Sequence, residues 1–278
     1  MLKQRILTAV VLLALLLPAL FASSPWPFDL LTMLAIGAAG WEWSRLNDGG
    51  ERPSIIFGVA LVLACGAALV AGWARQAPPV LWWLAALVWV PGGAWALHLG
   101  PDFWPALPKF ARRVIGALAL WTAWLALANA KAAGINFLLS VMCLVWAADI
   151  AAYFGGRAFG RRKLAPSISP GKSWAGVWSG MLGVFALALG WLLLDRQFAL
   201  GSASLYTGLA DRIGLIGLAV ALAFLAAMSV VGDLVESLVK RSVGAKDSSH
   251  LLPGHGGVLD RIDALLPVVP LALALHAF

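Results

Sequence analysis

Charged residues and cysteine are both scarce in this sequence. Asp, Glu, Lys and Arg make up only 12% of its 278 residues, whereas 62% are hydrophobic and the mean hydropathy is +0.88. Such a balance excludes an ordinary soluble globular domain and indicates an integral membrane protein. The two cysteines, Cys65 and Cys143, both fall within apolar runs, where a reduced thiol packs as a small hydrophobic group. A disulfide framework and a zinc cluster are therefore excluded.

The sequence also lacks an internal repeat and any segment polar enough to form a separate soluble domain. Its pI of about 9.9 is compatible with nucleic-acid binding. However, the excess positive charge lies in short segments beside apolar runs, where anionic lipid headgroups are the nearer partner. We therefore expect membrane lipids as partners and no nucleic acid.

Apolar runs long enough to approach or cross a bilayer recur along the whole chain. They are apolar all round, which favours helices over a barrel, and we expect an all-α polytopic membrane protein with about nine transmembrane helices. Residues 1–130 are interpreted as N-terminal transmembrane helices and residues 131–278 as a C-terminal transmembrane catalytic region, together one membrane-embedded unit. The nine runs lie at 6–22, 28–43, 54–72, 79–98, 112–129, 134–154, 174–194, 212–231 and 263–277.

The distribution of Lys and Arg predicts the topology, because cytoplasmic loops hold the excess of these residues. With the N-terminus inside, 16 of the 20 Lys and Arg fall on the cytoplasmic side. The C-terminus is then on the opposite side. Lys3 and Arg5 ahead of an apolar stretch are also compatible with a cleavable signal peptide, which would leave the remaining topology unchanged. The residues on the opposite side are Arg75, Lys131, Arg196 and Arg212.

Polar residues gather in two cytoplasmic stretches, of which residues 148–176 form the first. Asp149 lies inside the sixth apolar run, where a carboxylate is costly and indicates function, although a structural pair with Arg157 is the alternative. The letters PGKS at 170–173 suggest a nucleotide P-loop, but Pro166 stands where that motif needs glycine. Lys172 and Ser173 at a helix N-terminus still suit an anion, unless Ser173 only caps the helix.

The second stretch, residues 231–267, has the stronger signal. Asp233, Glu236, Ser237 and Lys240 fall at i, i+3, i+4 and i+7, which places them on one face if the eighth helix continues past the membrane surface. A PGHGG turn at 253–257 leaves room for a ligand. Two further carboxylates, Asp260 and Asp263, follow three residues apart, so both could face one point; helix-dipole stabilisation is the alternative reading.

Carboxylates without a Cys or His cluster favour a hard cation, Mg²⁺ in particular, held together with substrate phosphates. Basic residues next to those carboxylates are expected if the ligand is a polyanion. A site that needs both signs of charge indicates phosphoryl or nucleotidyl transfer.

These residues resemble the long signature of the phosphatidate cytidylyltransferases, also called CDP-diacylglycerol synthases. The resemblance covers most of the C-terminal half, including GDLVES at 232–237 and SPGKSWAG at 169–176, while the N-terminal half matches only in hydropathy. The chain departs from the family pattern where Gly171-Lys172-Ser173 replaces Lys-Lys-Thr and where Ala175 replaces an acidic residue. The matching positions are Ser237, Lys240-Arg241, Lys246-Asp247, Pro253, His255-Gly256-Gly257, Asp260-Arg261 and Asp263.

The resemblance implies a Mg²⁺-dependent nucleotidyltransferase of phospholipid biosynthesis in a bacterial-type cytoplasmic (inner) membrane. Such an enzyme joins CTP to phosphatidic acid, giving CDP-diacylglycerol and pyrophosphate. Both reactants are negatively charged, so catalysis is expected to consist mainly of positioning and charge stabilisation at the cytoplasmic face. A second metal or a monovalent cation is left open.

The expected roles fall into three groups. Metal ligands are expected at Asp149, Asp233, Asp260 and Asp263, with Asp233 and Asp260 foremost. Catalytic residues are expected at Asp233, Asp260, Lys240, Lys246 and His255; the alternative for His255 is a turn histidine bonded to a backbone carbonyl. His98, His250 and His276 are taken as structural. Substrate-binding residues are expected at Arg157, Lys172, Ser173, Ser237, Arg241, Asp247, Gly256, Gly257 and Arg261.

Two other functions fit parts of the pattern. A CTP-dependent lipid-alcohol kinase would use a similar site but would have to deprotonate an alcohol. A transporter of anionic solutes would also use charges within the membrane, but at paired positions in two related halves, whereas here they concentrate at one face of the C-terminal half. Acyl-chain preference and oligomeric state stay open, with a homodimer among the allowed forms.

Overall fold

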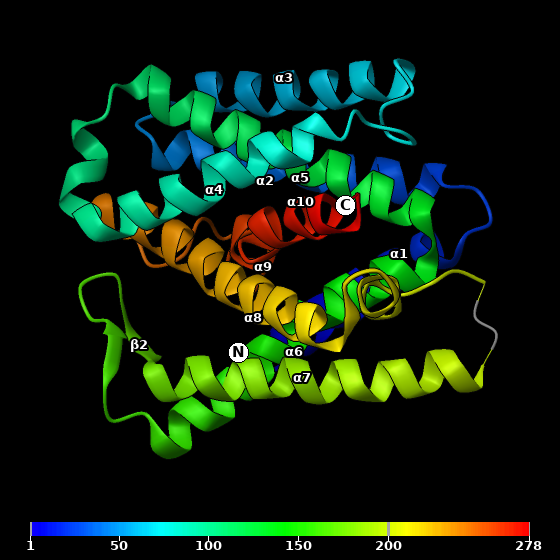
Figure 1. Cartoon of the computed structure of the whole chain (residues 1–278). Helices are drawn as coiled ribbons and strands as arrows, with labels where there is room; N and C mark the ends of the chain where they lie inside the picture. The colour runs from blue at the N-terminus through cyan, green and yellow to red at the C-terminus, as the bar shows by residue number, and fades with distance from the viewer. Residues whose placement is uncertain (1, 199–200, 278) are drawn as a thin grey trace.

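A computed structural model of the chain describes residues 2–198 and 201–277, and helices dominate it. The predicted all-α class is confirmed, with one small β-hairpin that was not predicted (Figure 1). The elements are α1 (Leu2–Phe21), α2 (Trp26–Leu46), α3 (Glu51–Val70), α4 (Val80–Leu99), η1 (Pro101–Ala106), α5 (Lys109–Ala133), α6 (Ile135–Phe159), β1 (Lys163–Ala165), β2 (Ser169–Ser173), α7 (Trp174–Gln197), α8 (Leu205–Ser242), α9 (Leu259–Ile262) and α10 (Leu265–His276).

Within the described residues, seven helices are long and apolar enough to cross a membrane: α1, α3, α4, α5, α6, α7 and α8. The chain is therefore a multi-pass membrane protein, but the predicted count of nine spans is not confirmed. α2 carries Asp29, Glu42 and Arg45 within its apolar run. α10 has 12 residues, a length of about 18 Å against a hydrocarbon core of about 30 Å.

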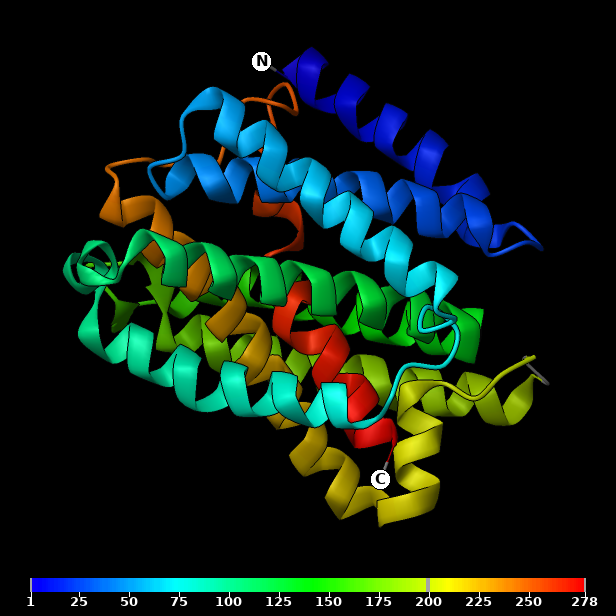
Figure 2. The ribbon, with the colours of Figure 1, turned by 90° about the horizontal axis from the view of Figure 1, so that it is seen from above.

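α10 lies at the centre of the helix assembly. It packs against α4, α5, α6 and α8, and every residue from Leu265 to Ala274 is buried (Figures 1 and 2). A helix that is apolar all round fits such a position as well as it fits a lipid environment. By contrast, α1 lies at the edge and packs mainly on α2, so most of its apolar surface faces outward (Figure 2).

α8 is the longest helix and is broken once, at Gly214, whose φ of 71° departs from helical geometry. The part after Gly214 is about 42 Å long at 1.5 Å per residue, which exceeds the thickness of the hydrocarbon core. The eighth apolar run, 212–231, therefore continues as a helix to Ser242, which is the condition under which its polar residues were placed on the helix. This extension carries Asp233, Glu236, Ser237 and Lys240 toward the end of the molecule where the hairpin lies (Figure 1).

Candidate active site

A cavity of about 600 Å³ opens between α6, the β1–β2 hairpin, α7 and α8. Its polar lining comes from the end of α6, the hairpin and the extension of α8, and consists of Asp149, Tyr153, Arg157, Lys163, Ser169, Lys172, Ser173 and Asp233. The remaining walls are apolar side chains and glycines, among them Ala148, Met181, Ala226 and Val230. The cavity therefore offers a charged part and an apolar part to one ligand.

An ion pair between the hairpin and α8 lies in the polar part of this cavity. Lys172 Nζ on β2 is 2.5 Å from Asp233 Oδ2, and Ser237 Oγ donates to Asp233 Oδ1 at 3.3 Å. The antiparallel pairing of β1 with β2 fixes the position of Lys172, because Ser173 pairs with Lys163. Ser173 then caps α7 by accepting from the Gly176 N–H at 3.2 Å. Ser173 is thus a helix cap that also lines the cavity.

Two more carboxylates interact electrostatically with this ion pair. Asp149 on α6 interacts with Asp233 and Lys172, and Asp263, between α9 and α10, interacts with Asp233, Lys172 and Asp149. We call Asp149 and Asp233, which line the cavity, together with Asp263, which interacts with both, the cavity carboxylates. Lys172 forms an ion pair with only one of the three, Asp233, so the other two lack a paired cation within the described residues, and a bound cation would supply one.

The predicted partner of Asp149 does not bind it. Arg157 lines the same cavity, but neither Asp149 nor Arg157 makes a hydrogen bond or ion pair within the described part of the chain. The structural alternative, an Asp149–Arg157 pair, is therefore not formed. Both side chains are exposed to solvent, which leaves them available to a ligand.

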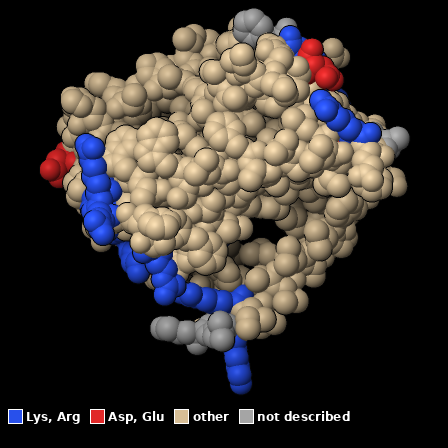
Figure 3. Space-filling view, turned by 60° about the horizontal axis from the view of Figure 1, so that its bottom comes forward, with Lys and Arg blue, Asp and Glu red and all other residues tan. Residues whose placement is uncertain are grey.

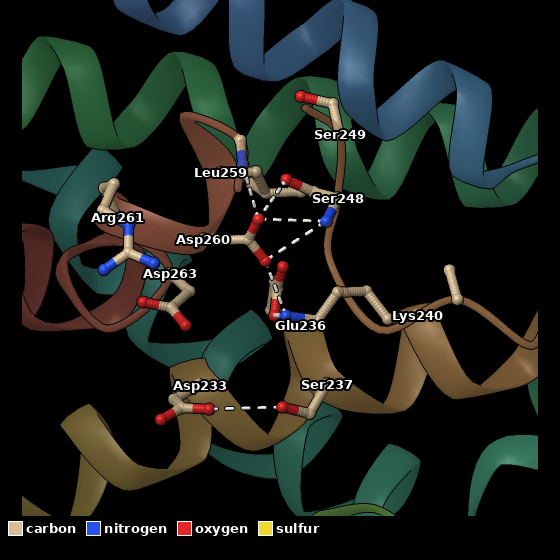
Figure 4. Close-up of polar contacts among 12 residues, drawn as sticks. Asp233, Glu236, Ser237, Lys240, Ser248, Ser249, Leu259, Asp260, Arg261 and Asp263 are labelled. Atoms are coloured by element: carbon tan, nitrogen blue, oxygen red, sulfur yellow. Dashed lines mark hydrogen bonds and ion pairs between the residues drawn. The ribbon is translucent and has the colours of Figure 1, made fainter. Parts of the chain in front are cut away.

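A second charged cluster lies on the neighbouring face of α8 (Figure 4). Lys240 Nζ is 2.5 Å from Glu236 Oε2 and 2.7 Å from Asp260 Oδ1. Asp260 also accepts from the Ser248 N–H, the Ser248 hydroxyl at 2.8 Å and the Gly257 N–H at 2.7 Å. Burial raises the pKa of Asp260, but these donors outweigh it and lower the pKa to about 2. Asp260 is thus ionised at neutral pH and holds the 248–257 loop.

Asp260 and Asp263, which were expected to face one point, have different partners. Asp260 binds the loop and Lys240. Asp263 instead interacts with the other two cavity carboxylates and accepts a hydrogen bond from the Ala264 N–H. Lys240, expected to be a catalytic residue, is likewise occupied by two carboxylates. A direct role of Asp260 or Lys240 toward a ligand stays a prediction, and it would require some of these contacts to be exchanged.

Two of the three glycines of the PGHGG turn, Gly256 and Gly257, are needed for this loop packing. Gly256 has a φ of 80°, and a Cβ there would lie 2.6 Å from Asp260 Oδ2. A Cβ on Gly257 would collide with Ser248 Oγ and Glu42 Oε1. In this structure both glycines therefore allow the loop backbone to approach carboxylates closely.

The other predicted residues lie around the cavity and the loop. Arg241 Nε donates to the Ile168 carbonyl at 3.3 Å, tying α8 to the hairpin, and Arg261 donates to the His255 carbonyl at 2.7 Å. His255 Nδ1 is buried and has no partner within the described residues, so its side chain does not make the expected alternative bond to a carbonyl through that atom. Lys246 and Asp247 are exposed on the loop.

Lys163, which lines the cavity, was not predicted as a site residue, and neither was Glu42, on α2. Its carboxylate is fully buried and accepts hydrogen bonds from the same loop, including one from the Leu259 N–H at 2.7 Å. The signal that could have identified it was the one used for Asp149, an acidic residue inside an apolar run. Glu42 lies near the end of the run at 28–43 and 206 residues before Ser248, so nothing local linked it to the loop.

Comparisons with known proteins agree with these features. A sequence model described as "Cytidylyltransferase family" matches residues 3–278. The chain is 40% identical to "Phosphatidate cytidylyltransferase" of Pseudomonas aeruginosa, over 99% of this chain and 97% of the relative. It is 39% identical to the protein of the same name in Haemophilus influenzae, over 97% of this chain and 96% of the relative. The protein of that name in Bacillus subtilis is 36% identical over 49% of this chain and 46% of its own length.

Replacing Lys240 by Met should destabilise the protein strongly. The change leaves Glu236 and Asp260 buried without their cation, and breaking a buried pair in this way costs about 3–5 kcal/mol. Thermal unfolding in detergent, followed by tryptophan fluorescence, measures the effect. The control is Lys246→Met, which removes an exposed lysine. If the two variants unfold at the same temperature, Lys240 does not hold the loop.

Proposed function

The chain belongs to the cytidylyltransferase family and transfers the cytidylyl group of CTP to phosphatidic acid, giving CDP-diacylglycerol and pyrophosphate, and we propose that it does so in the cavity between α6, α7 and α8. The observation that carries this proposal is the Lys172–Asp233 ion pair with Asp149 and Asp263 beside it, at the polar end of a cavity whose other walls are apolar. A phospholipid matches a cavity with one polar end and apolar walls, because it has an anionic headgroup and apolar acyl chains.

The reaction requires two anions to approach each other. A phosphate oxygen of phosphatidic acid forms a bond to the α-phosphorus of CTP, and the bond from that phosphorus to the oxygen bridging to the β-phosphate breaks, releasing pyrophosphate. The attacking oxygen is already ionised near neutral pH, so no general base is needed. Lys163, Lys172 and Arg157, which line the cavity, would offset the repulsion and hold the phosphates in line.

The cavity carboxylates fit a hard divalent cation by their chemistry. They supply only oxygen atoms, which Mg²⁺ prefers, and Mg²⁺ usually binds one or two carboxylates together with substrate phosphates. Among the described residues no three Asp, Glu, His or Cys side chains converge closely enough to hold a metal by themselves. We propose that Asp233 and Asp263, with Asp149, would hold Mg²⁺ when CTP supplies the remaining oxygens. The ion would stabilise charge on the phosphates.

We also propose that the cavity opens at the cytoplasmic face of a bacterial inner membrane, with the N-terminus on the same side. Lys and Arg side chains form a row along one edge of the surface, at the end of the molecule where the hairpin lies (Figures 1 and 3). Cytoplasmic segments carry such an excess of positive charge.

The reaction predicts where label from CTP appears. Purified protein is given phosphatidic acid, Mg²⁺ and CTP labelled at the α-phosphate. We expect label in the lipid fraction together with an equimolar amount of pyrophosphate. Label that stays in soluble CDP, with phosphate transferred to a lipid alcohol, would instead identify a kinase.

Metal dependence is tested by Asp233→Asn. Loss of one carboxylate ligand should raise the Mg²⁺ concentration for half-maximal rate by at least about tenfold, since even outer partners of metal ligands have effects of that size. The control is Asp102→Asn, an exposed carboxylate on η1 that does not line the cavity. A wild-type protein that remains active in a chelator would disprove the metal proposal.

Topology is tested with single cysteines. The background is a protein in which Cys65 and Cys143 are replaced by Ala. The α3–α4 connection and the α8–α9 loop lie at opposite ends of the molecule (Figures 1 and 2), and Gln76→Cys and His250→Cys place a thiol at an exposed position in each. A membrane-impermeant maleimide added to whole cells should label only the Gln76→Cys variant, and His250→Cys only after permeabilisation. The reverse pattern would place the site on the outer side.

A further inference from the structure

Glu42 is the only fully buried carboxylate among the described residues that binds the loop between α8 and α9. It lies on α2 and accepts four hydrogen bonds. The Ser249 hydroxyl donates at 2.6 Å and the Ser248 hydroxyl at 3.3 Å. The N–H groups of Val258 and Leu259 donate at 2.9 and 2.7 Å. A buried carboxylate with this many donors holds them firmly, because releasing any of them exposes charge to an apolar interior.

The loop is held between two carboxylates. Glu42 binds it from α2, and Asp260 binds it from the start of α9 through Gly257 and Ser248. The Ser248 hydroxyl contacts both carboxylates, at 3.3 Å from Glu42 Oε2 and 2.8 Å from Asp260 Oδ2. Asp260 in turn binds Lys240 on α8. This chain of contacts connects α2 to α8 through the loop.

The contacts of Glu42 with Val258 and Leu259 set where α9 begins. Asp263 follows Leu259 by four residues, about one helical turn, and it contributes to the cavity carboxylates. A shift of Val258 and Leu259 would therefore displace Asp263 relative to Asp233. Glu42 itself has no exposed surface and does not line the cavity, so it does not touch the substrates.

We propose that Glu42 is a positioning residue for the reaction, acting through the loop and α9 on the placement of Asp263. The proposal rests on the function assigned above to the cavity carboxylates. It gives α2, in the N-terminal half of the chain, a defined part in the site.

Glu42→Gln tests the proposal. The variant keeps the shape of the side chain but removes the charge and turns an NH₂ group toward N–H donors. We expect kcat per folded molecule to fall at least about tenfold and the Mg²⁺ concentration for half-maximal rate to rise, with partial rescue at high Mg²⁺. Hydrogen exchange at the amides of Val258 and Leu259 should become faster, and this readout does not depend on activity.

Asp29→Asn is the matched control, because Asp29 is also fully buried on α2 and pairs with Arg75 near the other end of that helix. It should lower stability without changing kcat per folded molecule or the Mg²⁺ dependence. If Glu42→Gln does not fold, Ser249→Ala removes one donor to Glu42 and should give a smaller change in the same direction.

The outcomes separate the two proposals. A wild-type protein without Mg²⁺-dependent transfer contradicts the proposed function. An active wild type with Glu42→Gln or Ser249→Ala unchanged in kcat and Mg²⁺ dependence overturns the positioning role alone. Equal kinetic losses in Glu42→Gln and Asp29→Asn would also overturn it, because they would reflect general destabilisation of α2.

Discussion

The organisation of this protein depends on how buried carboxylates are neutralised in a largely apolar chain. An ionised carboxylate inside such a protein is costly unless it has a cation or several hydrogen-bond donors. Asp29 has Arg75, and Asp195 has the side chains of Ser204, Thr207 and Asn136. The cavity carboxylates are less well compensated, because Lys172 pairs with Asp233 alone and neither Asp149 nor Asp263 forms an ion pair within the described residues. That imbalance marks the place where a cation and phosphates belong.

α8 organises both halves of the site. Asp233 lines the cavity and accepts a hydrogen bond from Ser237, four residues later, whereas Lys240 binds Glu236, four residues earlier, and Asp260. One rigid helix therefore sets the distance between the ligand cavity and the loop that carries Asp260. The hairpin contributes Lys172, and the residue directly after α9 contributes Asp263. Such a site, built largely on packed helices, needs little rearrangement to hold two repelling substrates.

The location of the cavity suits a reaction between a water-soluble nucleotide and a lipid. The charged lining lies at the helix ends, and the apolar lining continues along α6, α7 and α8 within their membrane-spanning lengths. A lipid headgroup and a nucleotide can thus meet while the lipid remains partly in the bilayer and the nucleotide partly in water. Charge stabilisation in such a partly dry site is stronger than in water, because fewer water dipoles screen it.

Sequence alone identified the helices and most of the charged residues of the site, and tertiary structure decided which of them act together. The run predicted at 174–194 is α7, Trp174–Gln197, and the run at 134–154 is most of α6, Ile135–Phe159, because length and hydropathy are local properties. Hydropathy does not distinguish a helix surrounded by lipid from a helix surrounded by protein. The run at 263–277 was therefore predicted to be a membrane span, although α10 is a short buried helix.

The partners of Asp260 and Asp263 could not be predicted from their spacing, since α9 ends between them and the loop turns back on Asp260. Nor could the contact of Glu42 with Ser248, across 206 residues, be predicted without the packing of α2. The sequence by itself determined which groups carry charge. Only the fold decided which charges meet, because hydrogen bonds between distant segments form only after the helices have packed.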